Sequence, residues 1–325
     1  MTDNVARMSS TASVTERPLT VIPVPVMGAE DVAVTDDGDV YTGTEDGSVF
    51  RISPDGSRVT RVGNTGGRPL GIEALPDGRL LVCDPSQGLL RLDPSNGEVE
   101  TLLEEVDGQR MLVCNNAAVA ADGTIYFSDS SRVHPLERWR ADIAEDTCSG
   151  RLIRLRPTDG GGWSRPEVLV SGLRFANGVA LAADESFVCV AESRGRTVVR
   201  RWLTGPRRGQ VDHLVTDLPG YPDNIARGSD GLIWVTLGGP TVWVLENVVS
   251  RLPLALRKLV TRLPEAVQPK ESPTVRVMAF DEAGGLVHDV DLPPEGFHFV
   301  TGVREHHGRV WLGSLHNAAV AHFDL

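Results

Sequence analysis

The stretch DGRLLVCDPSQGLLRL, residues 77–92, decides how this chain folds. An Asp-Gly turn leads into a short apolar run, a second turn follows at residues 85–87, and a further apolar run completes the unit. Asp-Gly between two such runs is a strong signal for a β-hairpin. The pattern occurs five more times, at residues 37–52, 122–131, 184–202, 230–239 and 307–323.

Each of these units follows an apolar run, and several are followed by another strand-like run such as VETLL at residues 99–103. Six units of about four strands each predict an all-β fold, a six-bladed β-propeller with four-stranded blades. Two β-sandwiches are a weaker alternative, because the repeat runs through the whole chain. The last unit supplies only three strands, so we expect a strand within residues 19–26 to complete it and close the ring.

The sequence predicts one propeller domain over residues 18–325, preceded by a flexible tail over residues 1–17. Residues 131–150 and 238–274 are longer than a blade needs and are expected to be insertions. Within the second, apolar residues recur at helical spacing from Glu246 to Arg262, and Pro253 would start or kink the helix. This helix could pack on the propeller rim, cover a site as a lid, or contact a membrane surface.

Charge and composition restrict the partners. The chain has 32 Lys and Arg against 44 Asp and Glu, a net charge of −12, which disfavours nucleic acid. No apolar run approaches the roughly 18 residues of a membrane span, and the first 17 residues lack an apolar signal core. We therefore expect a cytoplasmic protein without a transmembrane segment, whose partner is a small-molecule substrate. The four cysteines show no CxxC spacing and are expected to be free thiols, three of them buried. The oligomeric state does not follow from the sequence.

One column of the repeat carries polar residues. The residues seven positions before each turn residue begin the strand that precedes the turn, and the first strand of each propeller blade lines the central channel. They should therefore form a ring at one mouth of the channel. The column contains Glu30, Leu70, Asn115, Asn177, Asp223 and Val300.

Four members of this column are oxygen donors, namely Glu30, Asn115, Asn177 and Asp223. Any one of them alone is typical of a turn or strand end. Together they form a hard ligand set without His or Cys, which favours Ca²⁺ and, less well, Mg²⁺ or Mn²⁺. Four protein oxygens leave coordination positions open, and such a cation acts as a Lewis acid.

Further candidates for the pocket come from the ring, from its neighbours in sequence and from the turns that join the second and third strands. Asn116 and Asn224 follow ligand candidates and could orient the site. A lone histidine in the insertion after the third unit could also reach inward. The main pocket candidates are Leu70, Asn116, His134, Glu192, Asn224, Thr301, His316 and Asn317.

The chain resembles the strictosidine synthase-like proteins, which belong with the gluconolactonase and regucalcin propellers. The resemblance rests on RPLGI (68–72), YFSDSS (126–131), LRFANGVAL (173–181), VAES (190–193), GYPDNI (220–225) and EHHGRVWLGSL (305–315). It covers residues 20–325 and implies a six-bladed propeller with a divalent cation, usually calcium, held by Glu, Asn, Asn and Asp. Matched motif by motif, these ligands are Glu30, Asn115, Asn177 and Asp223.

The chain also departs from its relatives. Strictosidine synthase uses a glutamate in its last blade for an amine–aldehyde condensation, and the matching residue here is Thr301. The histidine pair of the related paraoxonases is missing, since Leu70 takes the first position and Cys83 to Pro85 supply no second. The third blade has Asn115-Asn116, which makes a second, structural calcium doubtful.

The leading hypothesis is a calcium-dependent hydrolase of a lactone or related ester. The cation would polarise the carbonyl, and Asp223 would act as general base or as nucleophile. One alternative is a non-catalytic, calcium-stabilised propeller that binds a small molecule or a protein. Another is an enzyme that forms C–C or C–N bonds.

Overall fold

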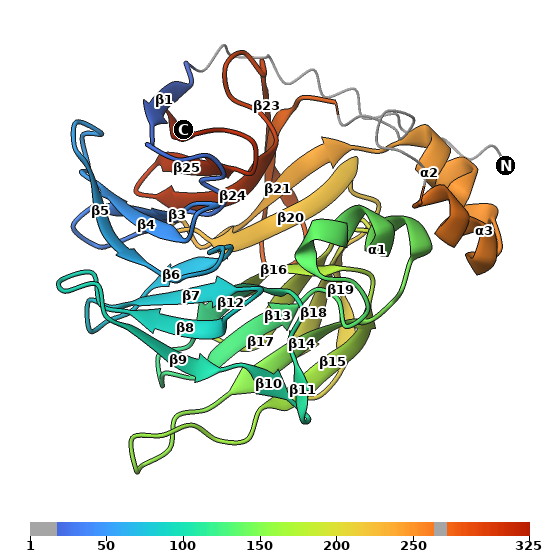
Figure 1. Ribbon diagram of the computed structural model, residues 1–325, viewed down its shortest axis with the longest axis horizontal. Coiled ribbons are helices and arrows are strands. Elements are labelled where there is room, and N and C mark those ends of the chain that lie inside the picture. The colour runs from blue at the N-terminus through green and yellow to red at the C-terminus, as the bar shows by residue number, and fades with distance from the viewer. Residues whose placement is uncertain (1–17, 263–271) are drawn as a thin grey trace, which may run out of the picture.

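The computed structural model describes residues 18–262 and 272–325, so the predicted tail over residues 1–17 lies outside the described residues. Six four-stranded antiparallel sheets surround a common axis, as Figure 1 shows, and this confirms the six-bladed propeller. In five blades the four strands follow one another along the chain. The sequence repeat therefore corresponds to the structural repeat.

The blades are numbered here in chain order. Blade 1 contains β2 (Ala33–Val34), β3 (Val40–Gly43), β4 (Ser48–Ile52) and β5 (Val59–Asn64). Blade 2 contains β6 (Ile72–Ala74), β7 (Leu80–Asp84), β8 (Gly88–Leu92) and β9 (Val99–Leu103). A small hairpin, β10 (Glu105–Val106) with β11 (Gln109–Arg110), leads to blade 3. Blade 3 contains β12 (Cys114–Val119), β13 (Ile125–Asp129), β14 (Gly150–Leu155) and β15 (Glu167–Leu173).

The second half of the chain repeats this order. Blade 4 contains β16 (Ala176–Leu181), β17 (Phe187–Glu192), β18 (Thr197–Trp202) and β19 (Val211–Val215). Blade 5 contains β20 (Gly220–Arg227), β21 (Ile233–Pro240), β22 (Val275–Phe280) and β23 (Leu286–Leu292). Blade 6 contains β24 (Val300–His306), β25 (Arg309–Ser314), β26 (Ala319–Asp324) and β1 (Thr20–Pro23).

Blade 6 joins the two ends of the described chain. β1 pairs antiparallel with β26, from Thr20 opposite His322 to Pro23 opposite Ala319. In Figure 1 the first strand, in blue, lies beside the last strands, in red. The predicted closure by an N-terminal strand is thus confirmed, and it gives the outermost position of the last blade to a strand from the other end of the sequence.

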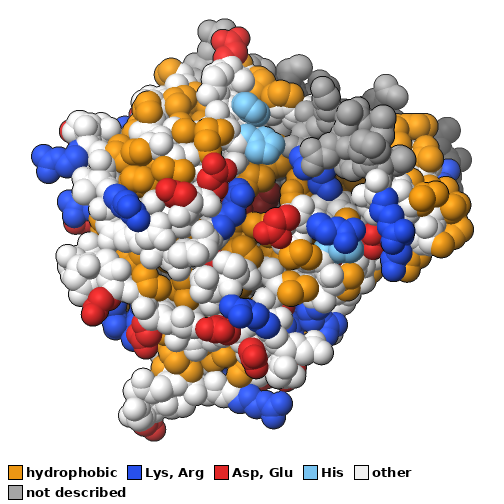
Figure 2. All heavy atoms as spheres, viewed as in Figure 1, with side chains coloured by type: hydrophobic (Ala, Val, Ile, Leu, Met, Phe, Trp, Pro, Cys, Tyr) orange, Lys and Arg blue, Asp and Glu red, His pale blue; other side chains and the backbone are white. Residues whose placement is uncertain are grey.

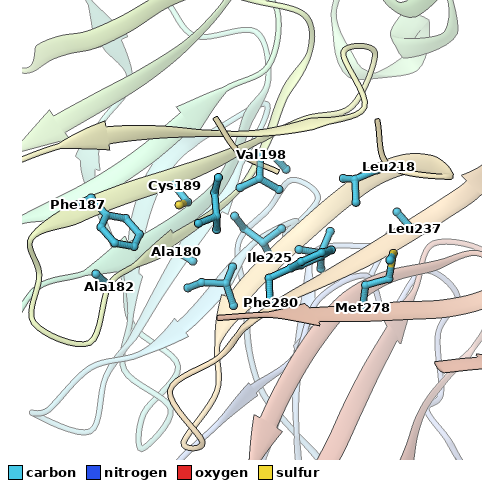
Figure 3. Close-up of a cluster of buried hydrophobic side chains, with 14 residues drawn as sticks. Ala180, Ala182, Phe187, Cys189, Val198, Leu218, Ile225, Leu237, Met278 and Phe280 are labelled. Atoms are coloured by element: carbon cyan, nitrogen blue, oxygen red, sulfur yellow. The ribbon is translucent and has the colours of Figure 1, made fainter. Parts of the chain in front are cut away.

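The core is divided among the blade interfaces. A buried apolar cluster fills the space between each pair of neighbouring blades. Figure 3 shows the cluster between blades 4 and 5, where Phe187 and Cys189 face Ile225, Leu237 and Phe280. Because both faces of each blade are buried, the middle strands read as continuous apolar runs. Cys83, Cys114 and Cys189 are buried free thiols, as predicted, and Cys148 is exposed and free.

Both predicted insertions connect the second and third strands of a blade, in blade 3 and in blade 5. The first contains η1 (Leu136–Arg138) and α1 (Trp139–Glu145), helices that the sequence analysis did not predict. The second contains α2 (Trp243–Asn247), η2 (Val249–Arg251) and α3 (Leu254–Val260). The prediction of one continuous helix from Glu246 to Arg262 is therefore wrong, whereas the prediction that Pro253 would start a helix is confirmed for α3. Leu252 is extended (φ −74°, ψ 145°) because the proline ring of Pro253 disfavours helical backbone before it, and α3 starts after that proline.

These five short helices, together called the cap, lie on one side of the propeller in Figure 1. None of the helices in residues 18–262 and 272–325 has the length and apolar character needed to cross a membrane.

Candidate functional site

The predicted ring lies in the first half of the inner strands or just before them, and its register is set by the hairpin that follows each one. In blade 2 the Leu75 N–H donates to the Arg79 carbonyl (2.8 Å), which closes a three-residue turn. In blade 6, His306 pairs directly with Arg309 and leaves a two-residue turn. Counting seven residues back from His307 therefore goes one residue too far. In blade 6 the ring position belongs to Thr301 and not to Val300. Val300, expected there from the sequence, is buried in the apolar cluster between blades 5 and 6.

The residue after each ring position alternates around the channel. Blades 2, 4 and 6 have glycine there, and blades 1, 3 and 5 have Asp or Asn. A Cβ on Gly71 would lie 2.6 Å from the Asn116 Cα, and one on Gly302 would lie 2.5 Å from the Asp31 Cα. Each glycine thus lets the next inner strand approach closely. The residues in these positions are Asp31, Gly71, Asn116, Gly178, Asn224 and Gly302.

A cavity of about 720 Å³ lies between the ring and the cap. Its polar end is formed by the six ring residues Glu30, Leu70, Asn115, Asn177, Asp223 and Thr301. Its remaining walls are mainly apolar and come from the cap and from segments beside the inner strands. They include Trp139, Ile143, Phe175, Tyr221, Trp243, Leu245, Val249, Val260, Phe299 and Leu315.

Three ring oxygens are buried without a hydrogen-bond partner among the described residues: Glu30 Oε2, Asn115 Oδ1 and Asn177 Oδ1. The Asn177 Nδ2 donates to Ser193 Oγ (3.2 Å), so the amide oxygen is the atom left for a ligand. The Ser193 hydroxyl in turn donates to the Pro222 carbonyl (2.6 Å), next to Asp223. Buried oxygens without partners are costly, so three of them at one cavity end favour the binding of a ligand that they can coordinate.

The two ring carboxyls carry perturbed pKa values. Burial raises the pKa of Asp223 to about 7, against the effect of a hydrogen bond from Asn177. Burial and the nearby Asp223 raise the pKa of Glu30 well above its usual range, although Arg68 opposes this. Two buried carboxyls whose ionisation is disfavoured in this way accommodate a cation readily.

The donor set therefore fits a hard divalent cation, and it has the character predicted from the sequence. Glu30, Asn115, Asn177 and Asp223 would supply carboxylate and amide oxygens. Within the described residues no group of three or more His, Cys, Asp or Glu side chains is arranged to hold a metal ion, as a zinc centre would need. The Thr301 hydroxyl donates to the Glu30 carbonyl (2.7 Å) and so holds the backbone of this ligand candidate.

Two of the predicted pocket residues line the cavity, Leu70 and Thr301, and the others lie outside its lining. Asn116 is fully engaged behind the ring: its Nδ2 donates to Asp31 Oδ2 (3.0 Å), and its Oδ1 accepts from the Val179 N–H (2.9 Å). Asn224 is buried beside Asp223, and neither its amide oxygen nor its amide nitrogen has a partner among the described residues.

The remaining four predicted residues organise loops. Glu192 accepts from the Arg174 N–H (2.8 Å), and Asn317 Oδ1 accepts from the His298 N–H (3.0 Å). His134 is buried with its Nε2 3.0 Å from Glu145 Oε2, so it holds the first insertion together and does not reach the ring. The His316 ring stacks on Phe299 (centroids 4.4 Å apart) and supports the cavity wall from behind.

The apolar wall was missed by the sequence analysis. Phe175 and Phe299, two residues before Asn177 and Thr301, both have left-handed backbone, with φ of 64° and 55°. This conformation is unfavourable for a bulky residue and is concentrated at functional sites. The spacing of these aromatics from the ring residues was visible in the sequence, but their backbone conformation was not.

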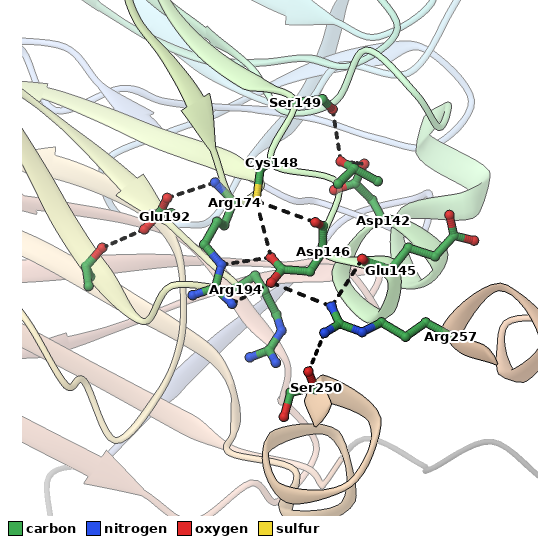
Figure 4. A network of polar contacts seen from close by, with 12 residues as sticks. Asp142, Glu145, Asp146, Cys148, Ser149, Arg174, Glu192, Arg194, Ser250 and Arg257 are labelled. Atoms are coloured by element: carbon green, nitrogen blue, oxygen red, sulfur yellow. Dashed lines mark hydrogen bonds and ion pairs between the residues drawn. The ribbon is translucent and has the colours of Figure 1, made fainter. Parts of the chain in front are cut away.

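A polar network ties the two halves of the cap together (Figure 4). Asp146 accepts from Arg174 Nε (2.7 Å) and lies 3.9 Å from Arg257 Nη1. Arg257 also donates to the Ser250 carbonyl. On the other side, Glu246 Oε1 accepts from Arg194 (2.7 Å) and from the Tyr221 hydroxyl (2.7 Å). The network attaches the cap to the propeller above the ring.

The chain is similar in sequence to strictosidine synthase-like proteins over most of its length. A family model described as strictosidine synthase matches residues 115–206, and the N-terminal model of strictosidine synthase-like proteins matches residues 21–52. A protein of Arabidopsis thaliana named strictosidine synthase-like 6 is 34% identical over 98% of this chain and 86% of its own length. The human adipocyte plasma membrane-associated protein is 31% identical over 92% of this chain and 76% of its own length.

Solved structures share the fold at low sequence identity. A gluconolactonase of Xanthomonas campestris superposes with a TM-score of 0.68 at 17% identity and covers 98% of this chain and 93% of its own. Regucalcin of Agrobacterium tumefaciens, described as a calcium-binding protein, has a TM-score of 0.65 at 12% identity and covers 96% of this chain and 95% of its own.

Proposed function

Because this chain belongs to the strictosidine synthase-like family of propellers, and because its channel mouth collects four oxygen donors, we propose that it is a calcium-dependent hydrolase of a lactone or related ester. The observation that carries this proposal is the set of three buried oxygens without partners, on Glu30, Asn115 and Asn177, at the polar end of a largely apolar cavity.

The roles of the residues follow from their chemistry. Glu30, Asn115, Asn177 and Asp223 would hold the cation, which when bound polarises the substrate carbonyl and stabilises negative charge on its oxygen. Asp223 would take a proton from a water molecule as the water oxygen bonds to the acyl carbon. The C–O bond to the leaving alkoxide then breaks, and the alkoxide receives the proton that Asp223 took from the water.

The cavity walls favour an apolar substrate. Trp139, Phe175, Leu245 and Phe299 present hydrocarbon surface, and apolar residues make up most of the lining outside the ring, although Glu137, Arg138 and Arg140 of the cap also line the cavity. A lactone or ester with an apolar acyl or aryl part would bury that part against the cap and place its carbonyl at the ring.

The geometry disfavours the amine–aldehyde condensation of strictosidine synthase. Thr301 has no acidic proton to offer, and its hydroxyl is already used to donate to the Glu30 carbonyl.

Free cysteines, including the exposed Cys148, agree with the proposed cytoplasmic location.

The test is hydrolysis of a panel of lactones of increasing acyl chain length, and of aryl esters, by the purified chain. Activity is measured after chelation and again after readdition of Ca²⁺, Mg²⁺ or Mn²⁺. We expect turnover only with metal, and a loss of about 100-fold or more in kcat for Asp223→Asn. Asp217→Asn, an exposed acid that does not line the cavity, is the matched control.

Turnover that persists after chelation would contradict the proposal, as would full activity of Asp223→Asn. Calcium binding by calorimetry together with silence on every ester would favour the non-catalytic alternative, in which the ion stabilises the propeller and the cavity only binds. A single turnover in ¹⁸O-labelled water separates the two roles of Asp223, because a nucleophilic carboxylate would acquire label in the protein.

A further inference from the structure

The second insertion, which contributes α2, η2 and α3 to the cap, has an unusually apolar outer face. Six large hydrophobic residues on or beside α2 and α3 are exposed, and the most exposed are Trp243 (69%) and Leu259 (60%). Figure 2 shows hydrophobic side chains gathered where α2 and α3 lie in Figure 1, beside Lys and Arg side chains. This apolar patch consists of Trp243, Val244, Val248, Leu254, Leu256 and Leu259.

The charge of this segment is opposite to that of the whole chain. Residues 243–262 contain four basic residues and one acid, a formal charge of +3, whereas the chain has −12. The acid, Glu246, is engaged by Arg194 and Tyr221, and Arg257 is engaged in the network beneath the cap. Arg251, Lys258 and Arg262 remain exposed at the patch.

We propose that the apolar patch and its basic residues dock on the surface of an anionic lipid bilayer. Short helices with exposed aliphatic and Trp side chains and adjacent Lys and Arg bind in the interface plane of such membranes. Charge complementarity orients the protein with this segment toward the bilayer. An anionic surface attracts the basic segment and repels the acidic protein as a whole.

The patch is also continuous with the cavity. Trp243 belongs both to the exposed patch and to the cavity lining, and Leu245, Val249 and Val260 of the same segment line the cavity from its inner side. Docking would therefore place the mouth of an apolar cavity at the lipid surface. A second copy of this chain is a poorer occupant, since its matching patch would bring two formal charges of +3 together.

The test is flotation of the whole chain with phosphatidylcholine vesicles and with vesicles that also contain phosphatidylglycerol, at low and high salt. We expect flotation with the anionic vesicles and its weakening by salt. Arg251→Gln with Lys258→Gln should lower the partition coefficient about fivefold for each charge. Leu254→Ser with Leu259→Ser should lower it about tenfold or more.

The matched control is Leu286→Ser with Val287→Ser, two exposed aliphatic residues (53% and 49%) on β23. This control should float like the wild type, and all variants should keep the wild-type thermal midpoint. The proposal fails if the wild type does not float with anionic vesicles, or if the control loses as much binding as the patch variant. It also fails if the patch variant floats normally but loses a dimer that the wild type forms without lipid. None of these readouts depends on hydrolytic activity.

Discussion

Replacement of Asp223 by Asn should stabilise the metal-free protein and make it indifferent to calcium. Burial raises the pKa of Asp223 from 3.8 to about 7, so the folded protein resists ionisation that the unfolded chain accepts. Stability associated with this group is present below the unfolded pKa and is lost as pH rises through the folded pKa. At about pH 8 and without a cation, the ionised Asp223 therefore lowers the free energy of unfolding by its full contribution.

The magnitude follows from the size of the shift. About three pKa units at 1.36 kcal/mol each give an upper value of about 4 kcal/mol for the gain in Asp223→Asn. With an unfolding entropy of about 2.1 cal/mol/K per residue, this gain corresponds to a rise in Tm of about 6 °C for a chain of this length. The variant also removes the charge repulsion between Asp223 and Glu30 that raises the pKa of Glu30. At about pH 4 the gain should vanish, because Asp223 is then largely protonated.

Thermal unfolding with and without calcium provides the assay. At a calcium concentration of about 100 times Kd, the wild type should gain about 2.7 kcal/mol and the variant almost nothing. Asp217→Asn, whose carboxylate is 91% exposed, should behave as the wild type under every condition. The reasoning is refuted if Asp223→Asn is no more stable than the wild type without metal, or if calcium stabilises both equally.

Three further predictions concern the ring and the cap. The calcium affinity of the wild type should fall about tenfold per pH unit below about pH 7, because Asp223 must lose its proton to bind; calorimetry across this range checks it, and a flat profile contradicts it. Gly178→Ala should cost about 3 kcal/mol or more in urea unfolding, because its Cβ would overlap the backbone of Asn224, whereas Gly160→Ala, in open space, should be neutral. Tyr221→Phe removes the hydroxyl that donates to Glu246 (2.7 Å), so proteolysis within the cap should accelerate about fivefold at an unchanged global Tm. If the variant is cleaved at the wild-type rate, this contact does not hold the cap.

The architecture could be read from the sequence because a propeller is a local repeat. Each Asp-Gly hairpin joins strands that are neighbours both in sequence and in the blade, so patterns such as residues 77–92 contain most of the necessary information. The ring could be read for the same reason, since equal spacing from equivalent hairpins gives equivalent places. The count failed only at Val300, where the turn has two residues, and turn length is a backbone property that His307-Gly308 did not reveal.

The cap and the cavity depended on contacts between distant segments. The helix from Trp139 to Glu145 is short and was not evident from periodicity, and it packs on α3, more than a hundred residues later. His134 illustrates the limit: its type suggested a site, but its partner Glu145 was decided by how the first insertion folds back.

By itself, the sequence determined that six hairpin units close into a ring and that Glu30, Asn115, Asn177 and Asp223 begin the inner strands of their blades. Only the tertiary structure decided which oxygens lack partners, which walls enclose them and which face of the cap is exposed. The physical reason is range: hairpins and strand alternation are set by neighbouring residues, whereas burial and electrostatic coupling arise from side chains that meet only when the ring is closed.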